Sequence, residues 1–282
     1  MKRIALFGIA IIPVTLASYY VVHALPVKSA DNLMVANAVV SKDDTTANVS
    51  RDIVKDLNDI IEKYPSLSIA ASLTDLENNQ TYNIGAVDTT FKGASTIKVL
   101  TAVYYLHRVE VGQASLTHQI DGVSARTLLQ RMLQNSDNDA WATIIVYLGS
   151  GNIQSYAQSI GLTSFYGYDY NTIKASDYVK LLVKLYDGEL ITADHRAALY
   201  SFMQNTDNDT LIPAALPSDA TVYHKWGDLW GNLHDIAIVQ YEGRSYALVI
   251  FTNNTDDTQA LYSTQVAAIK EISRTAIEDF EN

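Results

Sequence analysis

Residues 91–100 read FKGASTIKVL and lead into the segment 98–107, which is apolar on nearly every face of a helix. A helix with apolar side chains all round is buried on every side. Ser95 follows Gly93 and Ala94 and opens this helix, so its backbone N–H is one of the donors without an intrahelical partner. Lys98 follows about one turn later, close to the same face. The segment therefore predicts a serine and a lysine near each other at the start of a buried helix.

Ser95 and Lys98 have two interpretations on this local pattern. Burial would lower the pKa of the lysine and make it a base that activates a serine nucleophile. The alternative is a helix cap beside a solvated lysine. Ser95 is the chain's single serine with a lysine three residues later, but a chain of this composition holds roughly one such pair by chance. The pair alone does not separate the two interpretations.

Strand patterns flank the helical part of the chain on both sides. The order helix, two strands, helical stretch, three strands, helix predicts an α+β fold. Its antiparallel five-stranded sheet is flanked by the terminal helices and joined to a separate helical lobe, with a cleft between them as the natural place for a site. The predicted segments are a helix over 53–61, strands over 67–73 and 81–84, helices within 95–203, strands over 221–225, 234–241 and 244–252, and a helix over 266–280.

The first 48 residues differ in composition from the rest. Lys2 and Arg3 precede residues 4–25, which contain no charged residue and are long enough to span a bilayer. This charge order keeps the N-terminus in the cytoplasm and predicts an extracytoplasmic domain, with an uncleaved anchor favoured over a cleaved signal peptide. The predicted parts are an anchor or signal peptide (1–25), a polar tether (26–48) and a globular domain (49–282) with a sheet lobe (49–94 and 215–282) and a helical lobe (95–214).

Composition and missing motifs exclude several classes of function. The net charge of −11 comes without a basic cluster, so no nucleic-acid partner is expected. The absence of cysteine excludes disulfides and thiolate metal sites. The six scattered histidines, with no His-Glu-x-x-His, P-loop or Gly-x-Gly-x-x-Gly motif, give no reason to expect a metal or a cofactor. No Gly-x-Ser-x-Gly elbow of an α/β-hydrolase is present either.

Two hexapeptides are near copies, QNSDND at 134–139 and QNTDND at 204–209. Neither continues into a calcium loop, because both lack the glycine at position six and the glutamate at position twelve. Their flanks also disagree, since the second copy is followed by the proline-containing LIPAALP, so we reject a duplication. The second copy, with Thr206 and Asn208, is predicted to form a helix end and a turn.

Three motifs follow one another in the chain: Ser95-x-x-Lys98, Ser136-Asp137-Asn138 and Lys225-Trp226-Gly227. They lie at a helix start, in the helical part and on the strand after it. In type, order and setting they resemble the class A β-lactamase and penicillin-binding-protein superfamily of serine acyl-enzymes, over roughly residues 50–280. The resemblance implies the superfamily's fold and a β-lactam or a cell-wall peptide amide as substrate. A non-catalytic cell-surface binding module on the same fold is the alternative.

The resemblance also implies roles for the motif residues. Ser95 would attack the carbonyl and Lys98 would take its proton. Ser136, helped by Lys225, would relay a proton to the leaving nitrogen. Asn138 would hold the substrate amide. We expect Asp137 to be structural.

Three further residues belong to the expected substrate site. The backbone amides of Ser95 and Asp228 would form the oxyanion hole, which is commonly worth about 3 kcal/mol per donor. Gly227 lies in the substrate-binding motif. Trp226 replaces the usual threonine or serine, whose hydroxyl binds a substrate carboxylate that Lys225 also attracts. Carboxylate recognition is therefore expected to differ in this chain.

The chain differs most from this superfamily in the region of the Ω-loop. Class A β-lactamases use a glutamate there to activate the deacylating water, but residues 140–174 contain no glutamate. Residues 165–178, FYGYDYNTIKASDY, look like a shortened Ω-loop. Asp169 is the sole acid of residues 140–174, and Asn171 lies nearby. The acyl-enzyme is thus expected to form and to hydrolyse slowly.

Two histidines near the third motif have ordinary interpretations. His224 should point to the opposite side of the strand from Lys225, with a surface or packing role. His234 and Asp235 are expected to form a local polar pair, not a catalytic dyad.

Overall fold

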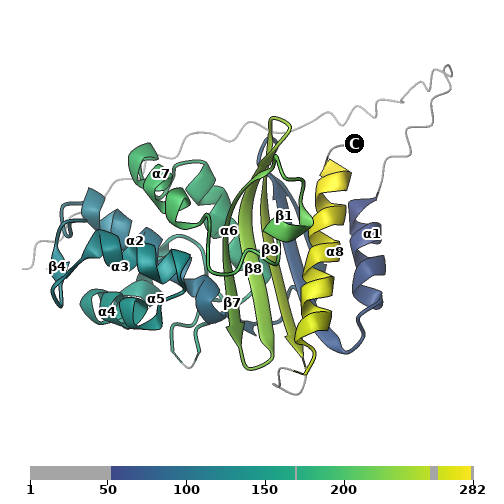
Figure 1. Ribbon diagram of the computed structural model, residues 1–282, viewed down its shortest axis with the longest axis horizontal. Helices are drawn as coiled ribbons and strands as arrows, with labels where there is room; N and C mark the ends of the chain where they lie inside the picture. The colour runs from purple at the N-terminus through teal and green to yellow at the C-terminus, as the bar shows by residue number, and fades with distance from the viewer. Residues whose placement is uncertain (1–51, 169, 255–259, 281–282) are drawn as a thin grey trace, which may run out of the picture. The chain divides into compact units, whose positions relative to one another are not determined.

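A five-stranded antiparallel sheet is the centre of the computed structural model, which describes residues 52–168, 170–254 and 260–280. Its strand order is β2-β1-β9-β8-β7, with helices on both faces (Figure 1). The predicted α+β fold is confirmed. The strands are β1 (Leu67–Asp75), β2 (Gln80–Gly85), β7 (Thr221–Leu229), β8 (Asn232–Tyr241) and β9 (Arg244–Asn254), with two short pairs, β3 (Phe91–Lys92) with β6 (Thr172–Ile173) and β4 (Gln119–Ile120) with β5 (Val123–Ser124).

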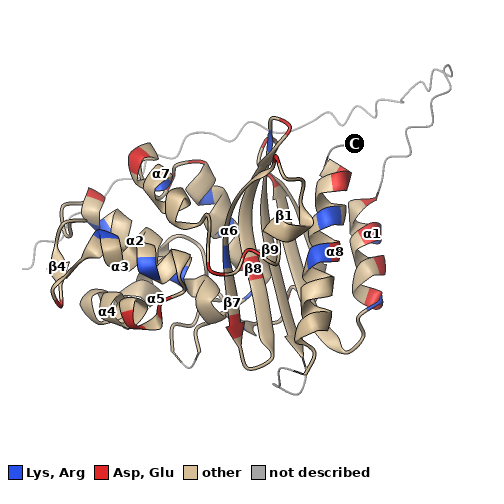
Figure 2. Cartoon of the chain, in the orientation of Figure 1, with Lys and Arg blue, Asp and Glu red and all other residues tan. Residues whose placement is uncertain are grey.

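The terminal helices α1 (Ile53–Glu62) and α8 (Tyr262–Phe280) lie side by side on one face of the sheet (Figure 1). The Asp52 carboxylate accepts a hydrogen bond from the backbone N–H of Lys55 and thereby caps α1. The apolar faces of both helices pack with alternate residues of the central strands, such as Leu248 and Ile250, into one buried core. Along α1 and α8 basic residues are interspersed with acidic ones (Figure 2).

The other helices form the second core, around α2. The residues of α2 from Val99 to Val103 are all fully buried, as the apolar pattern of the segment predicts. Figure 1 shows α6 against the sheet and the other helices of the lobe beyond it. The elements of this part are η1 (Ala94–Ile97), α2 (Lys98–Glu110), α3 (Ala125–Gln134), α4 (Asn138–Leu148), α5 (Ser150–Ser159), α6 (Ala175–Tyr186), α7 (Ala193–Phe202) and η2 (Pro213–Ala215).

Strand β7, which carries the third motif, is longer than predicted. It continues to Leu229 and turns into β8 through Trp230 and Gly231, whose φ angles are 45° and 72°. Apolar and polar residues do not alternate regularly after Lys225, so the sequence pattern predicts a strand that is too short. The turn between β8 and β9 is as predicted, because Glu242 and Gly243 both have positive φ, as a type I′ hairpin requires.

Predictions for the N-terminal part lie outside the described residues. Residues 4–25, predicted as an anchor or signal, and the tether over 26–48 both fall in this range. Within the part of the chain that the structure describes, every helix is too short or too polar to cross a bilayer.

Candidate active site

Ser95 lies on the single turn η1 that leads into α2. Ala94 before it has a φ of 48°, a left-handed conformation that costs energy for any residue with a Cβ. The turn is fixed by Thr96, whose N–H and hydroxyl both donate to the carbonyl of Gly93. Gly93 has no space for a side chain, since a Cβ would lie 2.5 Å from Ile97. Backbone strain of this kind is found at active sites, where the surroundings maintain it.

Strand β7 passes directly against this turn. A Cβ on Gly227 would lie 2.7 Å from the backbone nitrogen of Ser95 and 2.9 Å from that of Thr96. Only a glycine allows such an approach. Asp228 follows on the strand and lines the same cleft as Ser95. The two residues whose amides are predicted to form an oxyanion hole therefore lie on adjoining segments.

Lys98 is buried below Ser95, with 1% of its surface exposed. Its Nζ donates to the carbonyl of Ser136 at 2.6 Å, to Asn138 Oδ1 at 2.8 Å and to Ser136 Oγ at 3.3 Å. Burial lowers the pKa of Lys98 to about 8, although the charges of Asp137 and Asp207 act in the opposite direction. At pH 7 roughly a tenth of such a lysine is neutral and able to accept a proton.

Lys225 on β7 approaches the same serine from the other side. Its Nζ donates to Ser136 Oγ at 3.1 Å and to the carbonyl of Trp226 at 2.8 Å. Burial, together with the nearby charge of Lys98, lowers the pKa of Lys225 to about 7. A hydroxyl accepts two hydrogen bonds and donates one, so Ser136 can accept from both lysines and still donate its proton to a third group.

The loop before α4 holds the second motif in place. Ser136 has a φ of 50°, which turns this short loop away from helical geometry. Asp137 caps α4, since its carboxylate accepts from the backbone N–H groups of Asp139 at 2.9 Å and Ala140 at 3.0 Å. It also forms a 2.5 Å ion pair with Arg131. The structural role predicted for Asp137 is confirmed.

A cleft of about 370 Å³ joins these elements. It brings together four of the predicted site residues, and Ser136 and Lys225 are connected to it through their hydrogen bonds. The predicted short Ω-loop supplies Tyr170 and Asn171, whose φ angles are 79° and 53°; Asp169 lies outside the described residues. The lining residues are Ala94, Ser95, Lys98, Asn138, Trp141, Tyr170, Asn171, Asp228 and Leu229.

Trp226 is not among the described residues that line this cleft. Its side chain instead contacts Asp207, which belongs to none of the three motifs. Its indole Nε1 donates to the carboxylate of Asp207 at 2.8 Å. Asp207 belongs to the second hexapeptide, and its backbone N–H donates to the carbonyl of Gln134, in the first hexapeptide, at 2.9 Å. The two copies are therefore in contact. In the sequence, only the similarity of the two hexapeptides pointed to Asp207. Because we rejected a duplication, we predicted no function for this residue.

The remainder of the second copy forms the predicted turn. Thr206 donates from its N–H and its hydroxyl to Asp209 Oδ1, at 3.0 and 2.6 Å. Asn208 Oδ1 accepts from the N–H and the hydroxyl of Thr210. The predicted turn is confirmed, but α7 already ends at Phe202, so Thr206 does not form the predicted helix end.

Trp141, on α4, is a second residue that lines the site but belongs to none of the three motifs. The Nζ of Lys98 lies 5.8 Å from the centroid of its ring. The indole N–H donates to Thr101 on α2, so the ring is fixed beside Lys98. Apolar residues at helical spacing gave no indication that this tryptophan faces a cleft and not the core.

The polar pair predicted for His234 and Asp235 is wrong. The two side chains lie on opposite faces of β8, because successive residues of a strand alternate. Asp235 is instead 3.0 Å from His224 Nδ1, and His224 Nε2 is 3.0 Å from Asp209. Burial lowers the pKa of His224, but the two carboxylates outweigh it and the net shift is upward. His224 is buried, which fits a packing role and excludes a surface one.

His234 has its own partners on the other face. Its Nε2 lies 2.8 Å from the carbonyl of Lys92, which can only accept, so this nitrogen carries the proton. Its Nδ1 accepts from the backbone N–H of Thr252. Burial lowers the pKa of His234 to about 4, and the ring is neutral at physiological pH.

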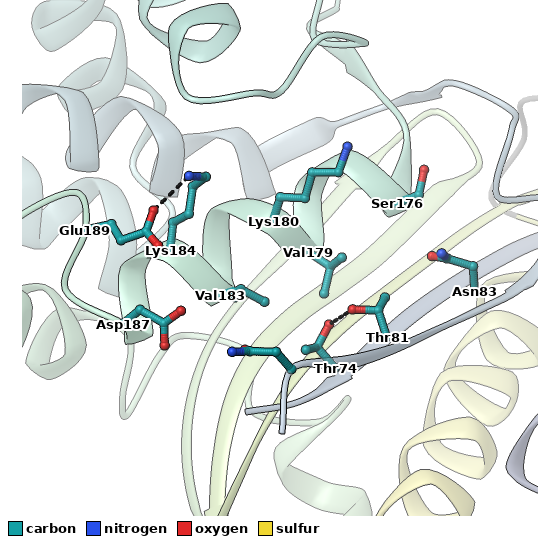
Figure 3. A pocket seen from close by; sticks show the side chains of 11 residues that line it. Thr74, Thr81, Asn83, Ser176, Val179, Lys180, Val183, Lys184, Asp187 and Glu189 are labelled. Atoms are coloured by element: carbon teal, nitrogen blue, oxygen red, sulfur yellow. Dashed lines mark hydrogen bonds and ion pairs between the residues drawn. The ribbon is translucent and has the colours of Figure 1, made fainter. Parts of the chain in front are cut away.

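A larger cavity, of about 580 Å³, lies between α6 and the β1–β2 hairpin (Figure 3). Its two lysines are occupied, because Lys180 pairs with Asp177 at 2.6 Å and Lys184 with Glu189 at 2.8 Å. In the described ranges no three His, Asp or Glu side chains gather as metal ligands would.

Comparisons with known proteins agree with this geometry. A family model described as the β-lactamase enzyme family matches residues 52–280. A β-lactamase of Proteus vulgaris is 25% identical over 250 residues, which cover 76% of this chain and 83% of that protein. The structure of PBP-A has a TM-score of 0.75 at 24% identity and covers 82% of this chain and 96% of its own. A PBP-A variant in an acyl-enzyme complex with penicillin G gives the same values. The two structures show a shared fold.

Proposed function

Because this chain belongs to the β-lactamase enzyme family, we propose that it is a serine hydrolase acylated at Ser95. The observation that carries the proposal is the position of the Ser136 hydroxyl, which accepts from both Lys98 and Lys225 beside the cleft that holds Ser95. Two buried lysines with lowered pKa values around one hydroxyl are costly for stability. Lysines with lowered pKa values can accept and donate protons near neutral pH, so this arrangement supports a function in proton transfer.

Acylation follows from these contacts. The Oγ of Ser95 forms a bond to the substrate carbonyl carbon, and its proton passes to neutral Lys98. The C–N bond then breaks while Ser136 donates its proton to the leaving nitrogen, and Lys225 replaces that proton through its 3.1 Å hydrogen bond. The backbone amides of Ser95 and Asp228 stabilise the oxyanion.

We further propose that the acyl-enzyme hydrolyses slowly. Among the described residues that line the cleft, the segment in the place of an Ω-loop contributes Tyr170 and Asn171, neither of which is a carboxylate. Asp228 is the one acid in that lining, and it lies on β7. A deacylating water then has no Ω-loop glutamate to activate it, since residues 140–174 contain none.

Substrate and location extend the same proposal. A cell-wall peptide amide or a β-lactam is the substrate, which the penicillin adduct of PBP-A supports by similarity of fold. The uncharged run over residues 4–25 behind Lys2 and Arg3 supports an extracytoplasmic domain held at the cell membrane. The departure at Trp226 favours a second candidate, a non-catalytic binding module on the same fold.

Intact-mass measurement over time, with benzylpenicillin and the purified protein, tests the proposal. A persistent adduct that is absent in Ser95→Ala is the expected result. Rapid turnover without an adduct would support the serine hydrolase but contradict the proposed slow deacylation. Absence of both adduct and turnover, with benzylpenicillin and with a cell-wall pentapeptide, would overturn the enzyme and leave the binding module.

A further inference from the structure

The carboxylate of Asp207 is held at the edge of strand β7. It accepts the 2.8 Å hydrogen bond from Trp226 Nε1, and its own backbone N–H donates to the carbonyl of Gln134 at the end of α3. Gln134 also donates from Nε2 to the carbonyl of Gln204 in the same loop, at 3.1 Å. Asp207 is thus fixed from two sides, by α3 and by β7.

This carboxylate acts on the two lysines of the proposed reaction. Its charge raises the pKa of Lys98 and that of Lys225, against the larger effect of burial. Lys225 also contacts the partner of Asp207, since its Nζ donates to the carbonyl of Trp226 and lies 4.9 Å from the centroid of the indole. The negative charge of Asp207 is therefore within electrostatic reach of the ammonium groups around Ser136.

A substrate carboxylate would compete with Asp207 for these groups. The family resemblance gives its recognition to Lys225 and to the residue that follows. Here that residue is Trp226, whose side chain has one donor, the Nε1–H, and Asp207 accepts it. Two carboxylates that approach the same cation also repel each other. Asp228 in the cleft lining adds a second acid.

We propose that Asp207 selects acyl donors that carry no carboxylate next to the scissile amide. The inference rests on the proposed function and names the substrate class of the same site. Asp207 supplies the negative charge that a substrate carboxylate would otherwise bring to Lys225. A fitting substrate continues beyond the leaving nitrogen with an uncharged or an amine-bearing group, such as a further peptide bond or a terminal amide. The acylation step is unchanged: the Ser95 Oγ–C bond forms, the C–N bond breaks, and the leaving nitrogen takes the proton.

Benzylpenicillin and its methyl ester differ at this one group and are matched probes. The second-order rate constant for acylation is measured with each by intact mass, and the ratio of ester to acid is compared between variants. Asp207→Asn retains an oxygen that accepts from Trp226 but removes the charge, so we expect the ratio to fall about tenfold. Asp194→Asn, on the exposed side of α7, removes one charge elsewhere and should leave the ratio within about twofold.

The outcomes separate this inference from the proposed function. Acylation by both probes, with a ratio that Asp207→Asn does not change, would overturn the selection by Asp207 and leave the serine hydrolase. An equal fall of the ratio in Asp194→Asn would assign the effect to net charge and also overturn it. If neither probe acylates Ser95 in any variant, the inference is overturned, and the cell-wall pentapeptide then decides whether the proposed function fails as well.

Discussion

Lys225 donates a 3.1 Å hydrogen bond to the hydroxyl of Ser136, and the same hydroxyl is 3.3 Å from Nζ of Lys98. The two ammonium groups thus face each other across one oxygen atom. Their charges repel, which is why the charge of Lys98 contributes to the lowered pKa of Lys225. The two lysines titrate as a pair, so the pH dependence of the site belongs to both.

We expect a bell-shaped pH dependence of acylation. The reactive form holds one proton on the pair, with Lys98 neutral to accept the proton of Ser95 and Lys225 charged to supply Ser136. Because Lys98 has the higher pKa, this is the minor of the two one-proton forms. Its share of the one-proton state does not change with pH, so the rate follows the population of that state. Below about pH 7 both lysines are protonated and above about pH 8 both are neutral, because their pKa values are about 7 and about 8. The rate constant should therefore be largest between these values. The measurement is acylation by benzylpenicillin from pH 5.5 to 9.5, and a profile that is flat over this range would contradict the shared-proton mechanism.

Gly227→Ala should abolish most acylation in a protein that still folds. The added Cβ would lie 2.7 Å from the backbone nitrogen of Ser95, so β7 or the η1 turn must move and the oxyanion donors separate. Losing one such donor costs about 3 kcal/mol, or a factor of about 100 in rate. Circular dichroism confirms the fold, and mass spectrometry gives the acylation rate.

The matched control is Gly151→Ala on α5. A Cβ there meets only the Tyr168 hydroxyl, at an ordinary distance of 3.5 Å. Alanine is the better helix former, so this variant should be more stable by about 0.5 kcal/mol and should acylate like the parent protein. Equal acylation rates in the two glycine variants would refute the close approach of β7 to Ser95.

The two hexapeptides give a second matched pair. Asn138 Oδ1 accepts from Lys98 Nζ at 2.8 Å, whereas Asn208 Oδ1 accepts from Thr210 within its own turn. Asn138→Ala should slow acylation by about 100-fold, because the base loses a positioning partner and the substrate amide loses its contact. Asn208→Ala should leave acylation within about twofold and lower the free energy of unfolding by about 1 kcal/mol. Similar acylation rates in both variants would show that the first copy does not belong to the site.

Much of the fold follows from the sequence because its signals are local. The apolar run of α2 predicts burial, and the Glu242–Gly243 turn predicts a hairpin, each from a few adjacent residues. Ser95, Ser136 and Lys225 are far apart in the sequence, so no local pattern predicts that they lie close together. Their proximity was predicted from the resemblance of three motifs to a family, and the hydrogen bonds of Lys98 and Lys225 to Ser136 agree with that arrangement.

The features that were missed depend on contacts between distant segments. Asp207 meets Trp226 only because a loop packs between α3 and β7, and the pattern of neither segment encodes that contact. The pairing of Asp235 with His224 instead of His234 follows from which face of β8 each residue occupies. Adjacent residues in a strand point in opposite directions, so proximity in sequence suggested the wrong partner.

His224→Gln should remove a pH-dependent part of the stability. His224 lies between the carboxylates of Asp235 and Asp209, and its pKa is raised above the usual value near 6.5. Stability from this cation is fully present below about pH 6.5 and is lost as the pH rises through the raised value. The variant leaves a buried carboxylate without its partner, so near pH 6 it should be less stable by about 3 kcal/mol. The difference should shrink steadily toward pH 9.

Denaturant unfolding of both proteins at pH 6, 7, 8 and 9 measures this difference. The lysines of the site contribute with the opposite sign, because lowered pKa values make stability rise with pH, but they are common to both proteins and cancel in the comparison. Asp235→Asn serves as the second variant, since it removes the buried carboxylate that contributes most to raising the pKa of His224, and its difference from the parent should also narrow with pH. A gap between parent and His224→Gln that stays constant from pH 6 to 9 would mean that His224 remains in one protonation state throughout, and the charged network would then have no part in the pH dependence of stability.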